Sequence, residues 1–145
     1  MKRKGILNRQ ILDLISKVGH GDLIVITDRG FPFPKNTSTE IIDLGFVPGI
    51  PSFEQVIFPL IDEIDVEGYV FAEEMKESNL SMVEQFENYP LIRDNAKISR
   101  KVIPHKEFKD LVLNESGNYP AVTGFIRTGE FTRYTNIILQ CGVVF

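Results

Sequence analysis

The segment Leu23-Ile24-Val25-Ile26-Thr27 is apolar almost throughout and rich in β-branched residues. A strand with one solvated face alternates apolar and polar residues, so an unbroken run indicates a strand that is covered on both faces. The loop-forming residues of Asp28–Pro34 follow at once and end the run. Strands of this kind belong to sheets that have helices on both sides. We therefore expect an α/β fold.

Helical and strand patterns alternate along the rest of the chain. Asn8 is expected to cap the first helix, Gly19 to end it in the left-handed conformation, and Pro59 to kink or shorten the second. The predicted helices cover residues 8–18, 51–64, 80–89 and 105–113, and the predicted strands cover 23–27, 40–44, 66–72, 96–103, 121–127 and 137–144. This order predicts one three-layer α/β/α domain over residues 1–145, with a mixed, largely parallel sheet. A turn and a short loop join the last two strands, so they are expected to pair antiparallel.

Composition narrows the classes of function. The net charge of −4 argues against a nucleic-acid-binding protein, and the basic cluster Lys2-Arg3-Lys4 is expected to be solvated. A single cysteine, Cys141, excludes an intramolecular disulfide and is expected to be buried and inert. The sequence has neither an apolar run that would span a membrane nor the apolar core of a signal peptide, so we expect a cytoplasmic protein.

Chemistry-bearing residues are few. The motifs of nucleotide-binding proteins and serine hydrolases are absent, as are zinc-binding spacings. What remains is His20, His105, Asp28 at the carboxyl end of a strand, and the polar segment Thr128–Asn136. An imidazole exchanges protons near neutral pH, and α/β sheets bind ligands at the carboxyl ends of their strands. These groups suffice for proton transfer without a cofactor or metal.

Each candidate also fits a structural role. His20 follows a helix and His105 begins one, Asp28 is a good loop former, and the polar segment suits a solvated loop. In an extended segment, Tyr134 and Asn136 would share one face, where a phenol and an amide suit a polyhydroxylated ligand. The acidic residues Glu73, Glu74 and Glu77 are expected to form a solvated helix start.

Short stretches along nearly the whole chain carry a resemblance to one family. They are Gly5-Ile6-Leu7-Asn8, Gly19-His20-Gly21-Asp22, Asp28–Pro34, Gly49-Ile50-Pro51-Ser52-Phe53, Ala72-Glu73-Glu74-Met75-Lys76, His105-Lys106-Glu107-Phe108-Lys109, Ile126-Arg127-Thr128-Gly129-Glu130, Tyr134-Thr135-Asn136 and Cys141-Gly142-Val143-Val144-Phe145. In this order and spacing, they resemble the D-ribose pyranase / L-fucose mutarotase family. Its ribose branch is favoured by Gly30-x-Pro32-x-Pro34, by Pro51-Ser52-Phe53 and by His105.

The resemblance implies an isomerase that interconverts ring forms of a free monosaccharide, D-ribose in the favoured branch, without a cofactor or metal. It assigns His20 as the proton donor and implies a homo-oligomer, a decameric ring with sites at subunit boundaries. Sugar binding is assigned to Asp28, His105, Tyr134, Thr135 and Asn136. Arg29, Phe131 and Thr135 depart from the family pattern and could reshape the pocket.

Alternatives stay open at this point. The substrate could be L-fucose or another sugar, the chain could be a non-catalytic sugar-binding accessory protein of an uptake system, or it could be a structural ring module. Geometry raises a further question, because His20 precedes the first strand and Asp28 follows it. Either the chain bends sharply at Gly19 and Gly21, or one site combines His20 of one subunit with Asp28 of its neighbour.

Overall fold

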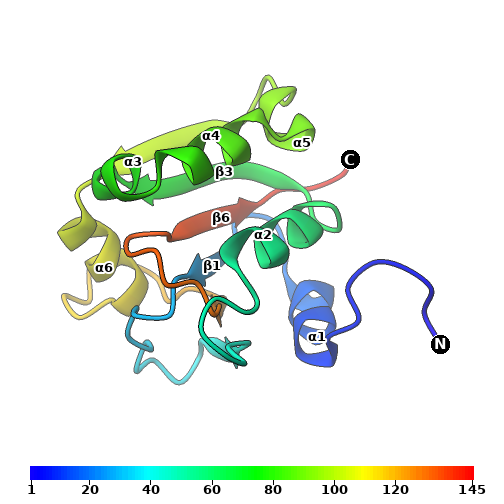
Figure 1. Ribbon diagram of the computed structural model, residues 1–145, viewed down its shortest axis with the longest axis horizontal. Helices are drawn as coiled ribbons and strands as arrows, with labels where there is room; N and C mark the ends of the chain where they lie inside the picture. Colours follow the sequence, from blue (N-terminus) through cyan, green and yellow to red (C-terminus); the bar gives the residue numbers. More distant parts are fainter.

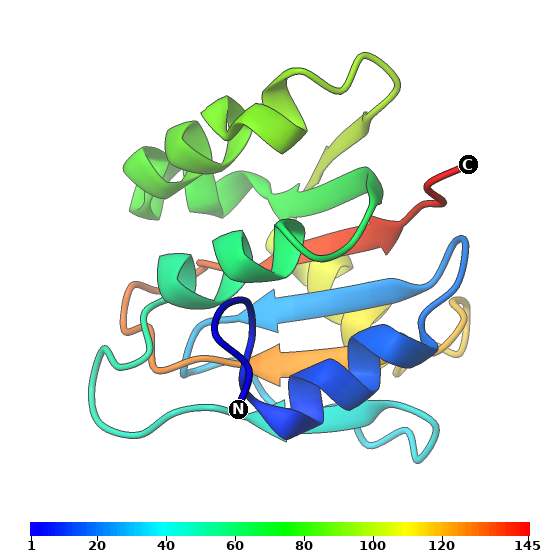
Figure 2. The ribbon, with the colours of Figure 1, turned by 90° about the vertical axis from the view of Figure 1, so that its right-hand side faces the viewer.

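A single six-stranded sheet organises the computed structural model, which describes all 145 residues. The strands are β1 (Leu23–Thr27), β2 (Glu40–Asp43), β3 (Val66–Ala72), β4 (Ser99–Ile103), β5 (Gly124–Arg127) and β6 (Ile137–Cys141). Their order is β2-β5-β1-β6-β3-β4. Neighbours are parallel except at β6, which runs antiparallel to both β1 and β3 (Figure 2). The predicted mixed, largely parallel sheet is confirmed.

Helices cover both faces of this sheet. They are α1 (Arg9–Lys17), α2 (Phe53–Ile61), α3 (Glu73–Ser78), α4 (Leu80–Asn88), α5 (Pro90–Arg93) and α6 (His105–Leu113). Apolar residues of α1, α2 and α4 pack against one face, and α6 packs against the other. Figure 1 shows the sheet nearly edge-on between these layers, with α6 on one side and α1 and α2 on the other. The three-layer α/β/α architecture is therefore confirmed.

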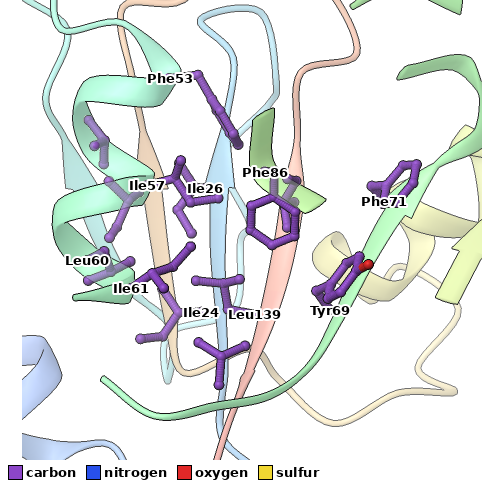
Figure 3. Close-up of a cluster of buried hydrophobic side chains, with 14 of the residues drawn as sticks. Ile24, Ile26, Phe53, Ile57, Leu60, Ile61, Tyr69, Phe71, Phe86 and Leu139 are labelled. Carbon is purple, nitrogen blue, oxygen red and sulfur yellow. The ribbon is translucent and has the colours of Figure 1, made fainter. Parts of the chain in front are cut away.

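Two hydrophobic clusters, one on each face of the sheet, explain the unbroken apolar run of β1. Ile24 and Ile26 point into the larger cluster, where residues of α2 and α4 such as Ile57 and Phe86 meet the sheet (Figure 3). Val25 points the other way and joins Phe108 of α6 in the smaller cluster. All three β1 residues are fully buried, because the strand is central and covered on both sides.

Local signals explain the helix boundaries, with one correction. Asn8 caps α1 by accepting a hydrogen bond from the N–H of Ile11 (3.0 Å). Ser52 and Gln55 form a capping box at the start of α2, and this helix ends two residues after Pro59. The expected left-handed ending at Gly19 is wrong. Positive φ occurs instead at Gly21 (+84°), because α1 ends at Val18 in an extended conformation.

The expected pairing of the last two strands is also wrong. β1 lies between β5 and β6, parallel to the first and antiparallel to the second. The connection from Thr128 to Asn136 is too long to act as a tight hairpin turn, and it crosses the carboxyl end of β1 instead. This insertion places Asp28 and Asn136 side by side.

Two remaining features bear on the candidate chemistry. Cys141 is buried as expected, and burial raises the pKa of its thiol to about 11. A thiol in this state is a poor nucleophile. None of the six helices combines the length and the apolar character that crossing a bilayer demands.

Candidate functional site

A cleft of about 510 Å³ opens at the carboxyl edge of the parallel strands. Three segments line it: the loop after β1 from Asp28 to Pro32, the first turn of α6 with His105, and the connection from Glu130 to Asn136. In Figure 2 these segments meet at the edge toward which the arrowheads of β1, β3 and β5 point. Ligand sites of small molecules have this size and this place in open α/β sheets.

Asp28 and Asn136 are locked together at the base of the cleft. The backbone N–H of Asp28 donates to Asn136 Oδ1 (2.9 Å), and the N–H of Gly30 donates to Asp28 Oδ1 (3.0 Å). A backbone N–H can only donate, so the first bond fixes the orientation of the amide. Asn136 Nδ2 is consequently left buried without a hydrogen-bond partner. This amide nitrogen can therefore donate a hydrogen bond to a ligand that enters the cleft.

Burial also shapes the carboxyl of Asp28, which is 7% exposed. Loss of solvent raises the pKa of this carboxyl above its ordinary value, and backbone N–H groups, that of Gly30 first, act in the opposite direction. A desolvated carboxylate accepts hydrogen bonds strongly from a ligand that brings donors.

His105 forms another wall of the cleft. Its backbone N–H at the start of α6 donates to Glu74 Oε2 (2.8 Å), so Glu74 is not only a solvated residue at the start of α3. The ring lies edge-on to Tyr134, with 4.8 Å between centroids. Burial lowers the pKa of the imidazole, which favours the neutral form, and Nδ1 is buried without a partner.

The predicted shared face of Tyr134 and Asn136 requires an extended segment, but the loop before β6 is not extended. Tyr134 has φ of +63°, a left-handed conformation that is unfavourable for a side chain. The loop is held from outside the cleft, since Asn79 Nδ2 donates to Thr135 Oγ1 (2.9 Å) and Ser78 Oγ donates to the carbonyl of Arg133 (2.8 Å). Tyr134 and Asn136 still line the same cleft, whereas the fully buried Thr135 side chain faces Asn79.

The residues that depart from the family pattern have different surroundings. Arg29 lines the cleft, but its guanidinium donates two hydrogen bonds to Asp43 (2.6 and 2.7 Å). This pairing holds the pKa of the Asp43 carboxyl well below its usual range. Arg127 also donates to Asp43 (3.1 Å), so two guanidinium groups share this one carboxylate. Phe131 lies at the rim of the cleft and is 66% exposed.

His20 lies at the other edge of the sheet. Gly21, Asp22 and the five residues of β1 separate it from Asp28. The strand alone, at about 3.3 Å per residue, spans roughly 16 Å. The His20 side chain is 64% exposed, and Nε2 lies 2.8 Å from Glu67 Oε2. Of the predicted site residues, the structure gathers Asp28, His105, Tyr134 and Asn136 in one cleft and leaves His20 outside it.

Sequence reasoning passed over two residues that the geometry brings forward. Lys109 lines the cleft one helical turn after His105, a spacing that could have indicated it. Glu67 contacts His20. Glu67 is the one charged residue in the otherwise apolar run of β3, and this could have indicated a special role for it.

The fold and the cleft define a mixed α/β protein with a polar ligand site at the carboxyl edge of its sheet. The chain belongs to the RbsD / FucU transport protein family, whose model matches residues 1–144. It is 38% identical over 145 residues to a D-ribose pyranase of Halalkalibacterium halodurans, with both chains covered completely.

Two solved structures share the fold. Bacillus subtilis RbsD complexed with D-ribose superposes with a TM-score of 0.84 and 38% identity, and both chains are covered completely. The fucose mutarotase of Streptococcus pneumoniae in complex with L-fucose gives a TM-score of 0.67 and 18% identity, again over both full chains.

Proposed function

We propose that this chain is a sugar mutarotase, an isomerase that interconverts the β-pyranose and β-furanose forms of free D-ribose without a cofactor. One observation carries the proposal: His105 Nδ1 and Asn136 Nδ2 are buried without partners in the cleft that also contains the Asp28 carboxyl. Unpaired buried polar atoms are costly, and the hydroxyls of a sugar would satisfy them. In this proposal residues 1–145 form one sugar-mutarotase domain that acts in the cytoplasm.

Each cleft residue then has a role that follows from its chemistry. Asp28 accepts hydrogen bonds from sugar hydroxyls, and Asn136 Nδ2 donates to a hydroxyl oxygen. His105 binds as a neutral imidazole, which burial favours. Tyr134 contributes its phenol, and Thr135 contributes through its backbone because its side chain is bonded to Asn79.

Similarity to a D-ribose pyranase and to a ribose-bound structure favours D-ribose as the substrate. The relative that shares 38% identity is named a D-ribose pyranase, and the structure with the same identity was solved with D-ribose. The fucose mutarotase shares 18% identity, which supports a common fold.

His20 is the proposed proton donor, and this role requires a second subunit. Ring opening needs a proton at the ring oxygen and the loss of one from the anomeric hydroxyl. His20 lies too far from the cleft of its own subunit to serve there. We therefore propose a homo-oligomer, a decameric ring, in which His20 of one subunit completes the cleft of the next.

The rim of the cleft supports such an assembly. Phe46, Ile50 and Phe131 are 83%, 53% and 66% exposed. The backbone joins them, because the N–H of Gly49 donates to the carbonyl of Gly129 (2.7 Å) and the N–H of Phe46 donates to that of Ile50 (2.9 Å). Phe131 lines the cleft, and Phe46 and Ile50 lie on the loop bonded beside it. Exposed apolar residues gathered next to a site favour burial against another protein surface.

Ring-form exchange can be measured directly by NMR saturation transfer on equilibrated sugar. The protein is expected to accelerate pyranose–furanose exchange of D-ribose, and L-fucose serves as the comparison substrate. Acceleration with L-fucose alone would mean that the protein catalyses anomer exchange of L-fucose and is not a ribose pyranase. Binding of D-ribose with no acceleration of either sugar would contradict the enzyme and favour the sugar-binding accessory protein.

Asn136→Asp is expected to weaken D-ribose binding by about 10-fold or more, the effect of losing a donor and facing an acceptor in its place. The new carboxylate keeps an oxygen for the N–H of Asp28, but it cannot donate to a sugar oxygen. It also stands beside the Asp28 carboxyl. Sugar titration followed by NMR would give the dissociation constants.

A matched control for this charge change is Asn118→Asp, because Asn118 is exposed and lies outside the cleft. That variant should bind D-ribose like the wild type. Unchanged affinity in Asn136→Asp, with a normal fold by circular dichroism, would show that Nδ2 does not contact the sugar.

A further inference from the structure

His20 belongs to a three-residue cluster at the edge of the sheet opposite the cleft. Its Nε2 lies 2.8 Å from Glu67 Oε2, and Gln140 Nε2 donates to Glu67 Oε1 (2.7 Å). Glu67 comes from β3 and Gln140 from β6. In the sheet, Gln140 lies opposite Leu23 of β1 and Gly68 of β3. The strand register therefore brings the three side chains together.

The backbone around His20 is fixed to β6. The N–H of Gly21 donates to the carbonyl of Cys141 (2.8 Å), and the N–H of Cys141 donates to the carbonyl of Asp22 (2.8 Å). The Asp22 carboxylate in turn accepts from the N–H of Gly19 (2.7 Å). With the main chain held and the side chain 64% exposed, the contact with Glu67 decides how the ring of His20 is turned.

This contact also decides which nitrogen of the ring is free. An ionised carboxylate can only accept hydrogen bonds, so the hydrogen of the contact lies on Nε2 of His20. In the neutral ring, Nδ1 then carries the lone pair, and in the protonated ring Nδ1 carries the second proton. Gln140 occupies the other oxygen of Glu67 and keeps the carboxylate turned toward the ring.

We propose that Glu67 is the positioning residue of His20, that it makes Nδ1 the nitrogen that exchanges a proton with the sugar, and that Gln140 orients Glu67. The inference rests on the proposed function, in which His20 is the donor. In ring opening, the Nδ1 proton passes to the ring oxygen as the bond from that oxygen to the anomeric carbon breaks. The anomeric hydroxyl gives its proton to water as the carbonyl forms. Reclosure reverses both transfers, and Glu67 neither gains nor loses a proton.

The test compares Glu67→Ala, which removes the acceptor, with Glu67→Gln, which keeps an oxygen for the Nε2 hydrogen. Glu84→Gln is the matched control, because Glu84 is exposed on α4. Nitrogen-15 NMR of the two imidazoles, assigned with His20→Ala and recorded across a pH series, should show a hydrogen-bonded Nε2–H in the wild type, with Nδ1 the nitrogen that gains and loses its hydrogen as the ring titrates. Glu67→Ala should lose the hydrogen-bonded signal, and Glu67→Gln and Glu84→Gln should keep it.

The kinetic expectation is a split between kcat and KM. Glu67→Ala should lower kcat for ring-form exchange by roughly 10–100-fold, as expected when the partner that orients a working imidazole is lost. KM should stay within about twofold, because sugar binding belongs to the cleft. Glu67→Gln should recover much of kcat, and Gln140→Ala should lose less than Glu67→Ala.

Two results would overturn the inference. One is a neutral wild-type His20 ring whose single hydrogen lies on Nδ1 and not on Nε2. The other is a Glu67→Ala variant that keeps wild-type kcat, or whose loss appears in KM and thermal stability alone, as a purely structural role would produce. Absence of turnover by the wild type would instead overturn the proposed function, while the nitrogen spectra test the contact between Glu67 and His20 separately.

Discussion

His20→Ala is expected to slow ring-form exchange of D-ribose by about 10²–10⁴-fold, the usual contribution of a positioned acid or base. The affinity for the sugar should change little, because the candidate binding groups Asp28, His105, Tyr134 and Asn136 all stay in place in the cleft. Folding should also be unaffected, since the side chain is 64% exposed and its hydrogen-bond partner is Glu67. Saturation-transfer rates and a sugar titration on the same sample would separate the two effects.

Asp28→Ala provides the contrast, because Asp28 lies in the cleft and its loss should reduce binding together with rate. His20→Gln should behave like His20→Ala, since an amide fills similar space without exchanging a proton near neutral pH. A His20→Ala protein that keeps the wild-type rate would mean that the cleft residues alone carry the proton transfer. In that case His105 and Asp28 would be the groups to examine next.

The sequence predicted the elements well wherever a local pattern decided the outcome. The run from Leu23 to Thr27 had to be buried on both faces, and the structure makes β1 a central strand. Asn8 marks a helix start because its side chain bonds to a nearby backbone N–H group. These signals span a few residues and do not depend on distant parts of the chain.

What escaped prediction depends on which strands become neighbours. No local pattern states that β6 lies between β1 and β3, yet this insertion rules out a hairpin of β5 and β6. It also creates the contact of Glu67 with His20 and the bond between Asp28 and Asn136. Likewise, Glu74 could be placed at a helix start, but its bond to the N–H of His105 joins segments 31 residues apart.

Mixing two inactive variants should restore activity if His20 and Asp28 of one site come from different subunits. In this structure the length of β1 keeps the two residues apart within a subunit. In a ring assembled from equal amounts of His20→Ala and Asp28→Ala chains, a site works only where an intact His20 faces an intact Asp28. Random placement makes about a quarter of the sites intact, so about a quarter of the wild-type rate is expected.

The experiment requires that the subunits exchange and that both variants fold. Co-expression with two affinity tags and sequential purification would isolate mixed rings, and native mass spectrometry would report how many 16.5 kDa chains each ring contains. Asp28→Asn offers a second inactive partner if Asp28→Ala is unstable, because its amide oxygen can still accept from the N–H of Gly30. Rings that contain both variants and remain inactive would contradict a shared site. His20 would then have to reach its own cleft by moving the loop that is bonded to β6, and the rate would depend on releasing the bonds of Gly21 and Asp22 with Cys141.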